Sequence, residues 1–147
     1  MTFDEAISAI EQLWLDEWVD DSDDERTPSV FDEEPSQLMT GDVPWCRVSI
    51  RHTGGTQATA GATGGRNFDR LGSVFVQVYT LTGAGRDNDD ESLSSSKLAQ
   101  AARAVFEAKR VEGTSLVFFT GDPREGATDG RWAMTTVEVP FRYRETK

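Results

Sequence analysis

The sequence predicts one α+β domain over residues 1–147, with two helices packed on one face of a mainly antiparallel or mixed sheet of four to five strands. Two observations lead to this fold class. Apolar residues follow a helical period at the N-terminus and again near residues 92–111. Segments that alternate apolar and polar residues lie between these helices and after the second one. The length is sufficient for a single hydrophobic core.

A first helix is predicted to begin after Thr2. The segment Thr2–Glu5 has the Ser/Thr-x-x-Glu form of a capping box, in which two side chains satisfy backbone N–H groups of the first turn. Apolar residues then recur at steps of three and four and form one stripe: Phe3, Ile7, Ile10, Trp14 and Trp18, broadened by Leu13, Leu15 and Val19. The acidic run Asp20–Glu25 is expected to end the helix, because carboxylates are unfavourable at its negative C-terminal end.

The middle of the chain predicts two long strands joined by a glycine-rich hairpin loop. Residues 20–44 form an acidic, proline-containing connecting segment with one short strand, Ser29–Phe31. The alternating strand Trp45–His52 follows, and alternation resumes over Phe68–Leu81. Residues 53–65 contain five glycines and no large apolar side chain, so we expect a flexible loop between the two strands.

The last third predicts a second helix followed by two strands. The helix covers Ser92–Val111, with Lys109 and Arg110 in its last turn and Gly113 just beyond it. The remaining expected elements are a short strand Leu116–Thr120, a turn Gly121–Pro123 and a long alternating strand Trp132–Arg144. Pro140 within the long strand favours an edge position or a bulge, because proline cannot donate to a strand ladder.

The charge is unevenly distributed. The net charge is −11, and residues 1–34 hold 13 of the 26 acidic residues with one base, giving −12. The remaining 13 acids and 14 bases give +1. Because Lys and Arg contacts to phosphate dominate nucleic-acid affinity, we expect no stable nucleic-acid binding. The N-terminus has no signal-peptide pattern and no segment is long enough to span a membrane, so a soluble, non-secreted protein is expected.

No segment carries a strong catalytic, metal or cofactor signature. The glycine-rich loop lacks the lysine of a phosphate-binding P-loop and joins two strands, not a strand and a helix. His52, the one histidine, has no marked nucleophile near it in sequence, and Cys46 falls on the apolar side of its strand. The acids of Asp20–Glu25 lack the glycine and spacing of a calcium loop. We therefore expect a protein that is not an enzyme and takes no cofactor.

Arginines predicted on the polar faces of strands provide the remaining hypothesis. Arg47, Arg51, Arg142 and Arg144 would make one sheet face basic, and the acidic N-terminal region of a second copy could meet that face and form a head-to-tail ring. Solvation of both surfaces is an equally good interpretation. The candidate interface residues are Arg47, Arg51, Arg66, Arg70, Arg142, Arg144, Asp20, Asp21, Asp23 and Asp24.

Four segments resemble the strands and second helix of the tail terminator (tail completion) proteins of long-tailed bacteriophages: 44–48, 70–78, 98–106 and 132–143. The resemblance implies a virion protein, assembled in the host bacterial cytoplasm, that forms a ring, expected to be a hexamer, on the end of the tail tube. There it would stop tube polymerisation and join the head. Its implied partners are further copies of itself, the tail tube protein and the head–tail connector protein.

Two other functions fit part of the sequence. A head-side neck or connector (head completion) protein would share this size, acidity and lack of chemistry. An acidic mimic of DNA that occupies a nucleic-acid-binding enzyme is a more distant alternative, because a mimic needs carboxylates along a whole face, whereas here they are concentrated in residues 1–34.

Overall fold

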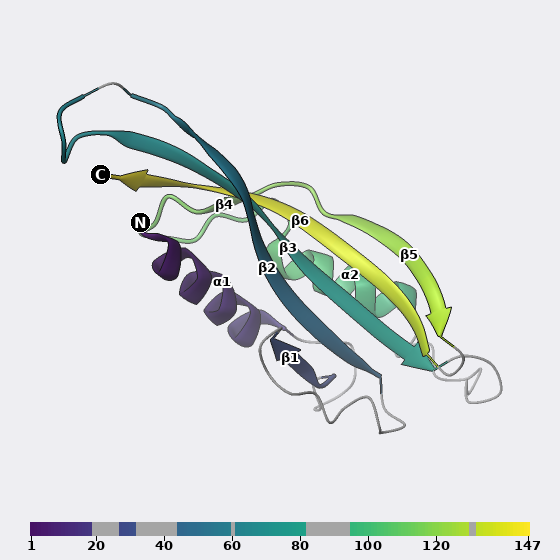
Figure 1. Cartoon of the computed structure of the whole chain (residues 1–147). Coiled ribbons are helices and arrows are strands. Elements are labelled where there is room, and N and C mark those ends of the chain that lie inside the picture. Colours follow the sequence, from purple (N-terminus) through teal and green to yellow (C-terminus); the bar gives the residue numbers. More distant parts are fainter. Residues whose placement is uncertain (19–26, 32–43, 60, 82–94, 130–131) are drawn as a thin grey trace.

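The computed structural model describes residues 1–18, 27–31, 44–59, 61–81, 95–129 and 132–147. Within these residues the chain forms an α+β fold with an open, mixed sheet, as predicted (Figure 1). The elements in chain order are α1 (Phe3–Glu17), β1 (Ser29–Phe31), β2 (Trp45–Gln57), β3 (Asn67–Leu81), α2 (Ser95–Phe106), β4 (Val117–Phe118), β5 (Asp122–Asp129) and β6 (Trp132–Thr146). The strand order is β1-β2-β3-β6-β4, with β5 also paired to β6, and only β1 and β2 are parallel.

Both helices pack on the same face of the sheet, here called the inner face. Alternate residues of the central strands are buried on it, namely Val74, Val76, Val78, Val137, Val139, Phe141 and Tyr143. Buried residues of α1 and α2 belong to the same core cluster. The opposite, outer face carries the intervening residues of the strands and has neither helix against it. The predicted two-layer arrangement is therefore confirmed.

The N-terminal helix begins as predicted. The Glu5 side chain accepts the backbone N–H of Thr2 at 2.7 Å, and Thr2 Oγ1 accepts the backbone N–H of Glu5 at 3.3 Å, which completes a capping box. Ile10, Trp14 and Trp18 of the predicted stripe are buried. Ile7 and Leu13 are half-buried, whereas Phe3 is 48% exposed and Leu15 is 49% exposed. The acidic run Asp20–Glu25 lies outside the described residues.

Aromatic rings connect all layers of the core. Successive ring centroids 4.0–6.2 Å apart link Trp18, Trp14, Phe106, Phe118, Phe141, His52 and Phe3. This path runs from the end of α1 through α2, β4, β6 and β2, and returns to the start of α1. Aromatic pairs of this kind add stability beyond the area that they bury. Consequently both ends of α1 are fixed to the sheet.

The β2–β3 hairpin is longer than predicted, and its loop is correspondingly shorter. β2 continues to Gln57, so residues 53–57 are strand and not loop, and a bulge between His52 and Gly54 shifts the register. Gly54–Gln57 pair with Phe68–Leu71. Backbone hydrogen bonds to this partner segment allow residues 54–57 to form a strand although they have no large apolar side chain. In Figure 1 this end of the hairpin projects beyond both helices, close to the two chain termini.

Pro140 does not lie in an edge strand, contrary to the prediction. β6 pairs with β3 along its whole length, and β4 and β5 pair with its other side. The carbonyl of Pro140 accepts the N–H of Phe119 at 2.9 Å, so Pro140 faces the side where β4 ends and β5 begins. The N–H and C=O of one strand residue point to the same side of the strand. The N–H that proline lacks would therefore point to the gap between the end of β4 and the start of β5, where no strand residue needs it.

β5 is the strand that the sequence analysis missed. It starts at Asp122, inside the predicted turn, and raises the strand count to six, one more than the upper prediction. Its pairing with β6 is shifted between Glu125 and Thr128, and Pro123 is tolerated because β5 has a partner on one side alone among the described strands.

The second helix ends at Phe106, five residues before the predicted end at Val111. Residues 108–111 instead pair with 116–119: Ala108 N–H donates to the Phe119 carbonyl at 3.2 Å, and Phe118 N–H donates to that of Lys109 at 2.8 Å. Gly113 has a φ of 72° in the turn between these segments, so it serves the turn and not the helix end. Residues 92–94 lie outside the described part. No helix of the described residues is long and apolar enough to cross a membrane.

Candidate functional site: the outer face of the sheet

The structure places on one face of the sheet the four arginines that were predicted on polar strand faces. Arg47 and Arg51 of β2 and Arg142 and Arg144 of β6 alternate with buried core residues, so all four lie on the outer face. The four aspartates Asp20, Asp21, Asp23 and Asp24 lie outside the described residues. Arg66 lies where the hairpin loop meets β3, and its Nε donates to the Gly61 carbonyl at 2.7 Å.

Arg70 differs from the other candidate arginines because it lies on the inner face. It shares its strand alternation with Val74 and pairs in register with Tyr143, which is buried. Its Nε and Nη2 both lie 2.7 Å from Glu145 Oε2. Arg70 is therefore part of a packed ion pair on the helix side of the sheet, not of the basic outer face.

Two exposed hydrophobic side chains lie among the outer-face arginines. Leu71 of β3 is 41% exposed and pairs in register with Arg142. Phe119 is 43% exposed and directly follows Phe118, which is buried on the inner face. Its N–H donates to the Pro140 carbonyl of β6, so the chain is still extended along β6 and Phe119 points to the outer face. Arg51 lies in the adjacent row of the sheet, opposite Ser73. We call Arg51, Leu71, Phe119 and Arg142 the outer patch.

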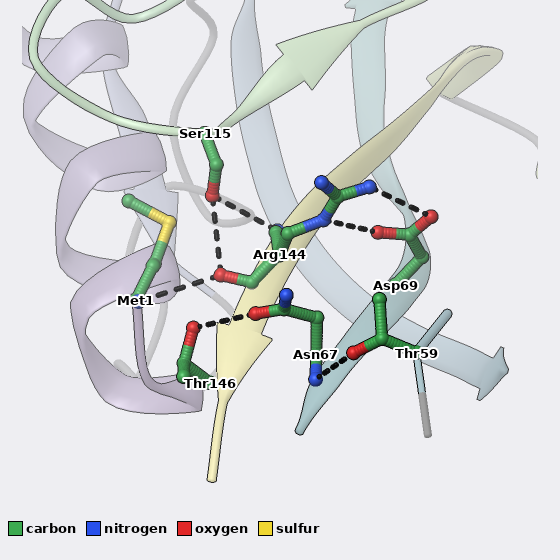
Figure 2. A network of polar contacts seen from close by, with 7 residues as sticks. All are labelled: Met1, Thr59, Asn67, Asp69, Ser115, Arg144 and Thr146. Atoms are coloured by element: carbon green, nitrogen blue, oxygen red, sulfur yellow. Dashed lines mark hydrogen bonds and ion pairs between the residues drawn. The ribbon is translucent and has the colours of Figure 1, made fainter. Parts of the chain in front are cut away.

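Within this group of arginines, Arg144 is held by its neighbours whereas Arg142 is not. Arg144 Nε donates to Asp69 Oδ1 at 3.0 Å, and its backbone is held by Ser115 and by the Met1 amino group (Figure 2). The hydrogen bond from Arg144 lowers the pKa of Asp69, and the same bond raises the pKa of Arg144. The Arg142 side chain is exposed and makes no hydrogen bond or ion pair to another described residue, although its charge also helps to lower the pKa of Asp69. It is therefore available to a carboxylate of a partner.

Arg47 completes the outer face near the other end of the sheet. Its guanidinium carbon lies 5.6 Å from the ring centroid of Trp45, and that ring stacks on Tyr79 at 4.3 Å. Burial raises the pKa of Tyr79, against a lowering by the Arg47 charge. Because Trp45 is buried and Arg47 is half-buried, this stack is a packed part of the domain. The outer patch is the more accessible region.

The inner face has a shallow hollow of about 510 Å³ beside the start of α1. Its lining includes Phe3, His52, Arg70, Tyr143 and Glu145. The His52 ring packs against that of Phe3 with centroids 4.0 Å apart and a tilt of 35°, and its Nε2 is buried without a hydrogen bond to any described residue. Burial, followed by repulsion from Arg70, lowers the pKa of His52, so the imidazole is neutral at neutral pH. The described residues contain no group of three possible metal ligands.

Glu145 provides a pH-dependent contribution to stability in this hollow. Burial would raise its pKa, but the hydrogen bonds from Arg70 and Lys147, together with the positive charges of both residues, outweigh burial and hold the pKa below its ordinary value. A carboxylate with a lowered pKa stabilises the fold above its unfolded pKa, about 4.3, and this stabilisation is lost as the pH falls through the folded value. Replacing Glu145 with Gln is expected to cost on the order of 1 kcal/mol at neutral pH.

Urea unfolding measured at neutral pH and between roughly pH 5 and pH 3 tests this expectation, because the Glu145→Gln variant should lose less stability than the wild type across the acidic range. Glu112→Gln is the matched control, since Glu112 is exposed and makes no ion pair to a described residue. If the Glu145 and Glu112 variants show the same pH dependence as the wild type, the contribution assigned to Glu145 is wrong.

Comparison with known proteins adds evidence on the fold. One solved structure is similar over the whole length, with a TM-score of 0.67 at 13% sequence identity, covering 100% of this chain and 99% of the other. Its description is a bare sequence identifier that states no function. The likeness shows the fold alone. No protein-family model and no curated protein sequence matches the chain.

Sequence reasoning missed two residues of the outer patch, although the signal for one of them was present. Leu71 has the same strand alternation as Phe75, Gln77 and Tyr79, so alternation alone puts it on the face opposite the valines Val74, Val76 and Val78. Phe119 had no comparable signal, since the short strand around it is too brief to show a period.

Proposed function

We propose that this protein is a structural component of a long-tailed bacteriophage that assembles as a ring on the end of the tail tube, stops tube polymerisation and provides the surface that joins the head. Its place would be the virion neck, and its partners would be further copies of itself, the tail tube protein and the head–tail connector protein. The work is done by repeated surface contacts, and no catalytic step or cofactor is required.

The outer patch is the observation that carries this proposal. It combines exposed arginine and exposed apolar side chains on a sheet face that neither helix covers. Arginine and aromatic residues are enriched at protein–protein interfaces, where lysine and carboxylates are depleted. The resemblance of four segments to tail terminator proteins then indicates which kind of assembly such a surface would serve.

Electron microscopy of particles made without this protein tests the proposed function. Abnormally long tubes without heads are the expected result, because nothing would stop polymerisation. Tails of normal length beside finished heads would assign the protein to the head-side connector instead. Intact infectious particles would exclude both positions.

A further inference from the structure

We propose that the outer patch of one copy binds the exposed surface of α1 of a second copy, so that copies associate head to tail. This inference deepens the proposed function, because it names the two surfaces through which copies would meet. It is tested in solution with the purified protein, whereas the position in the virion is tested by particle morphology. Failure of one therefore leaves the other standing.

The exposed surface of α1 is acidic with an apolar residue within it. The helix contains five acidic residues and no basic residue. Glu5 is used in the capping box, Glu17 pairs with Lys109, and Asp16 accepts a hydrogen bond from the Gln12 side chain at 2.7 Å, which leaves Asp4 and Glu11. Residues 4, 11 and 15 lie on one side of the helix, since they are separated by about two turns and one turn. Leu15 on this side is 49% exposed.

The two surfaces have opposite charges and similar apolar content. The outer patch offers Arg51 and Arg142 around Leu71 and Phe119, and α1 offers Asp4 and Glu11 beside Leu15. Opposite charges favour the correct encounter, and burial of the apolar side chains supplies affinity. Pairing of one outer patch with another would oppose arginines, and pairing of two α1 surfaces would oppose carboxylates. The charges therefore disfavour a symmetric dimer through either surface.

The two surfaces lie on opposite sides of the sheet. α1 packs on the inner face through Ile10 and Trp14, and its acidic surface with Leu15 lies on a flank of the helix, about 100° around from Trp14, whereas the outer patch lies on the other face of the sheet. A copy can therefore bind one neighbour with each surface at the same time. Contacts between two different surfaces form a closed ring when the rotation between copies permits it, and an open filament otherwise.

Charge reversal gives a test with a specific outcome. Arg142→Glu impairs the outer patch and leaves α1 intact, and the double variant Asp4→Arg, Glu11→Arg impairs α1 and leaves the outer patch intact. Each variant alone is expected to associate at least tenfold more weakly than the wild type, because like charges would face each other. An equimolar mixture is expected to associate again, because the intact α1 of the first variant can bind the intact outer patch of the second, and the two reversed surfaces again carry opposite charges.

Sedimentation velocity at concentrations up to the millimolar range measures the species formed, and circular dichroism confirms that each variant is folded. Arg124→Glu is the matched control: Arg124 is 70% exposed and lies on the same face in β5, opposite Thr136 and therefore six residues along β6 from Arg142, so the same charge change outside the outer patch should leave association unchanged. A monomeric wild type throughout this range, an unaffected Arg142 variant, or a mixture that does not pair would each overturn the inference.

Discussion

Replacing Trp14 with alanine is expected to lower the free energy of unfolding by about 3–5 kcal/mol, a large part of the stability of a typical domain. Trp14 is fully buried, with its ring stacked on Trp18 at 4.4 Å and on Phe106 at 5.9 Å. Truncation opens a cavity between α1 and α2 that the surrounding backbone cannot close. It also removes the hydrogen bond from the indole N–H to Ser29 Oγ at 3.0 Å, which connects α1 to β1.

Urea unfolding followed by far-ultraviolet circular dichroism measures this loss. Leu15→Ala, on the same helix, is the matched control, because a side chain that is 49% exposed should cost less than about 1 kcal/mol when truncated. The measurements are made at low protein concentration, so that self-association does not contribute. Equal losses for the two variants would contradict the packing of α1 described above.

The same two residues show how far the sequence pattern determines the N-terminal helix. Steps of three and four identify the stripe, and Ile10, Trp14 and Trp18 are indeed buried. The pattern does not indicate how wide the covered part of the stripe is. Leu15 lies at the margin of the stripe. Phe3 lies in the first turn, where the exposed fraction of its side chain depends on how much of it the neighbouring His52 of β2 covers. Those two errors therefore come from tertiary structure.

The errors in the sheet have a related cause, which is pairing between distant segments. β5 has glycine, proline and charged residues that are typical of a turn, and it becomes a strand because β6 is long enough to offer it a partner. Pro140 is tolerated inside the sheet because the strand opposite its missing donor is interrupted. Neither fact is visible in a local window of sequence, because each depends on which segment lies alongside.

The candidate site was predictable to the extent that it follows strand alternation. Alternation placed Arg47, Arg51, Arg142 and Arg144 on one face, and the register confirms it. The same rule separates Arg70 from them, since it alternates in phase with the core valines of β3. Alternation could not predict which arginine side chains are already bound to a carboxylate of the same chain, as Arg144 is to Asp69.

The second large effect is expected from replacing Gly72 with alanine, which should lower the free energy of unfolding by about 2–3 kcal/mol. A Cβ atom at this position would lie 2.4 Å from Phe141 Cζ and 2.5 Å from the backbone oxygen of Arg51. The ring is 1% exposed and contacts His52 and Phe118, so it has no free space to move into. The Arg51 oxygen belongs to β2, and its displacement would disturb the pairing of β2 with β3.

Gly54 provides the matched control for Gly72, because it is also a strand glycine near the bulge but has no atom within 4 Å of an added Cβ. Alanine at Gly54 is expected to be neutral or to stabilise by up to about 0.5 kcal/mol, since it reduces the freedom of the unfolded chain. Thermal and urea unfolding of both variants give the comparison. Strand propensity alone would favour alanine over glycine at both positions, so a clear loss at Gly72 alone would show that the close approach of Phe141, and not local preference, requires glycine there. If alanine costs little at Gly72, as it should at Gly54, the Phe141 side chain can move away from the added methyl group at little cost, and the argument for glycine at position 72 is wrong.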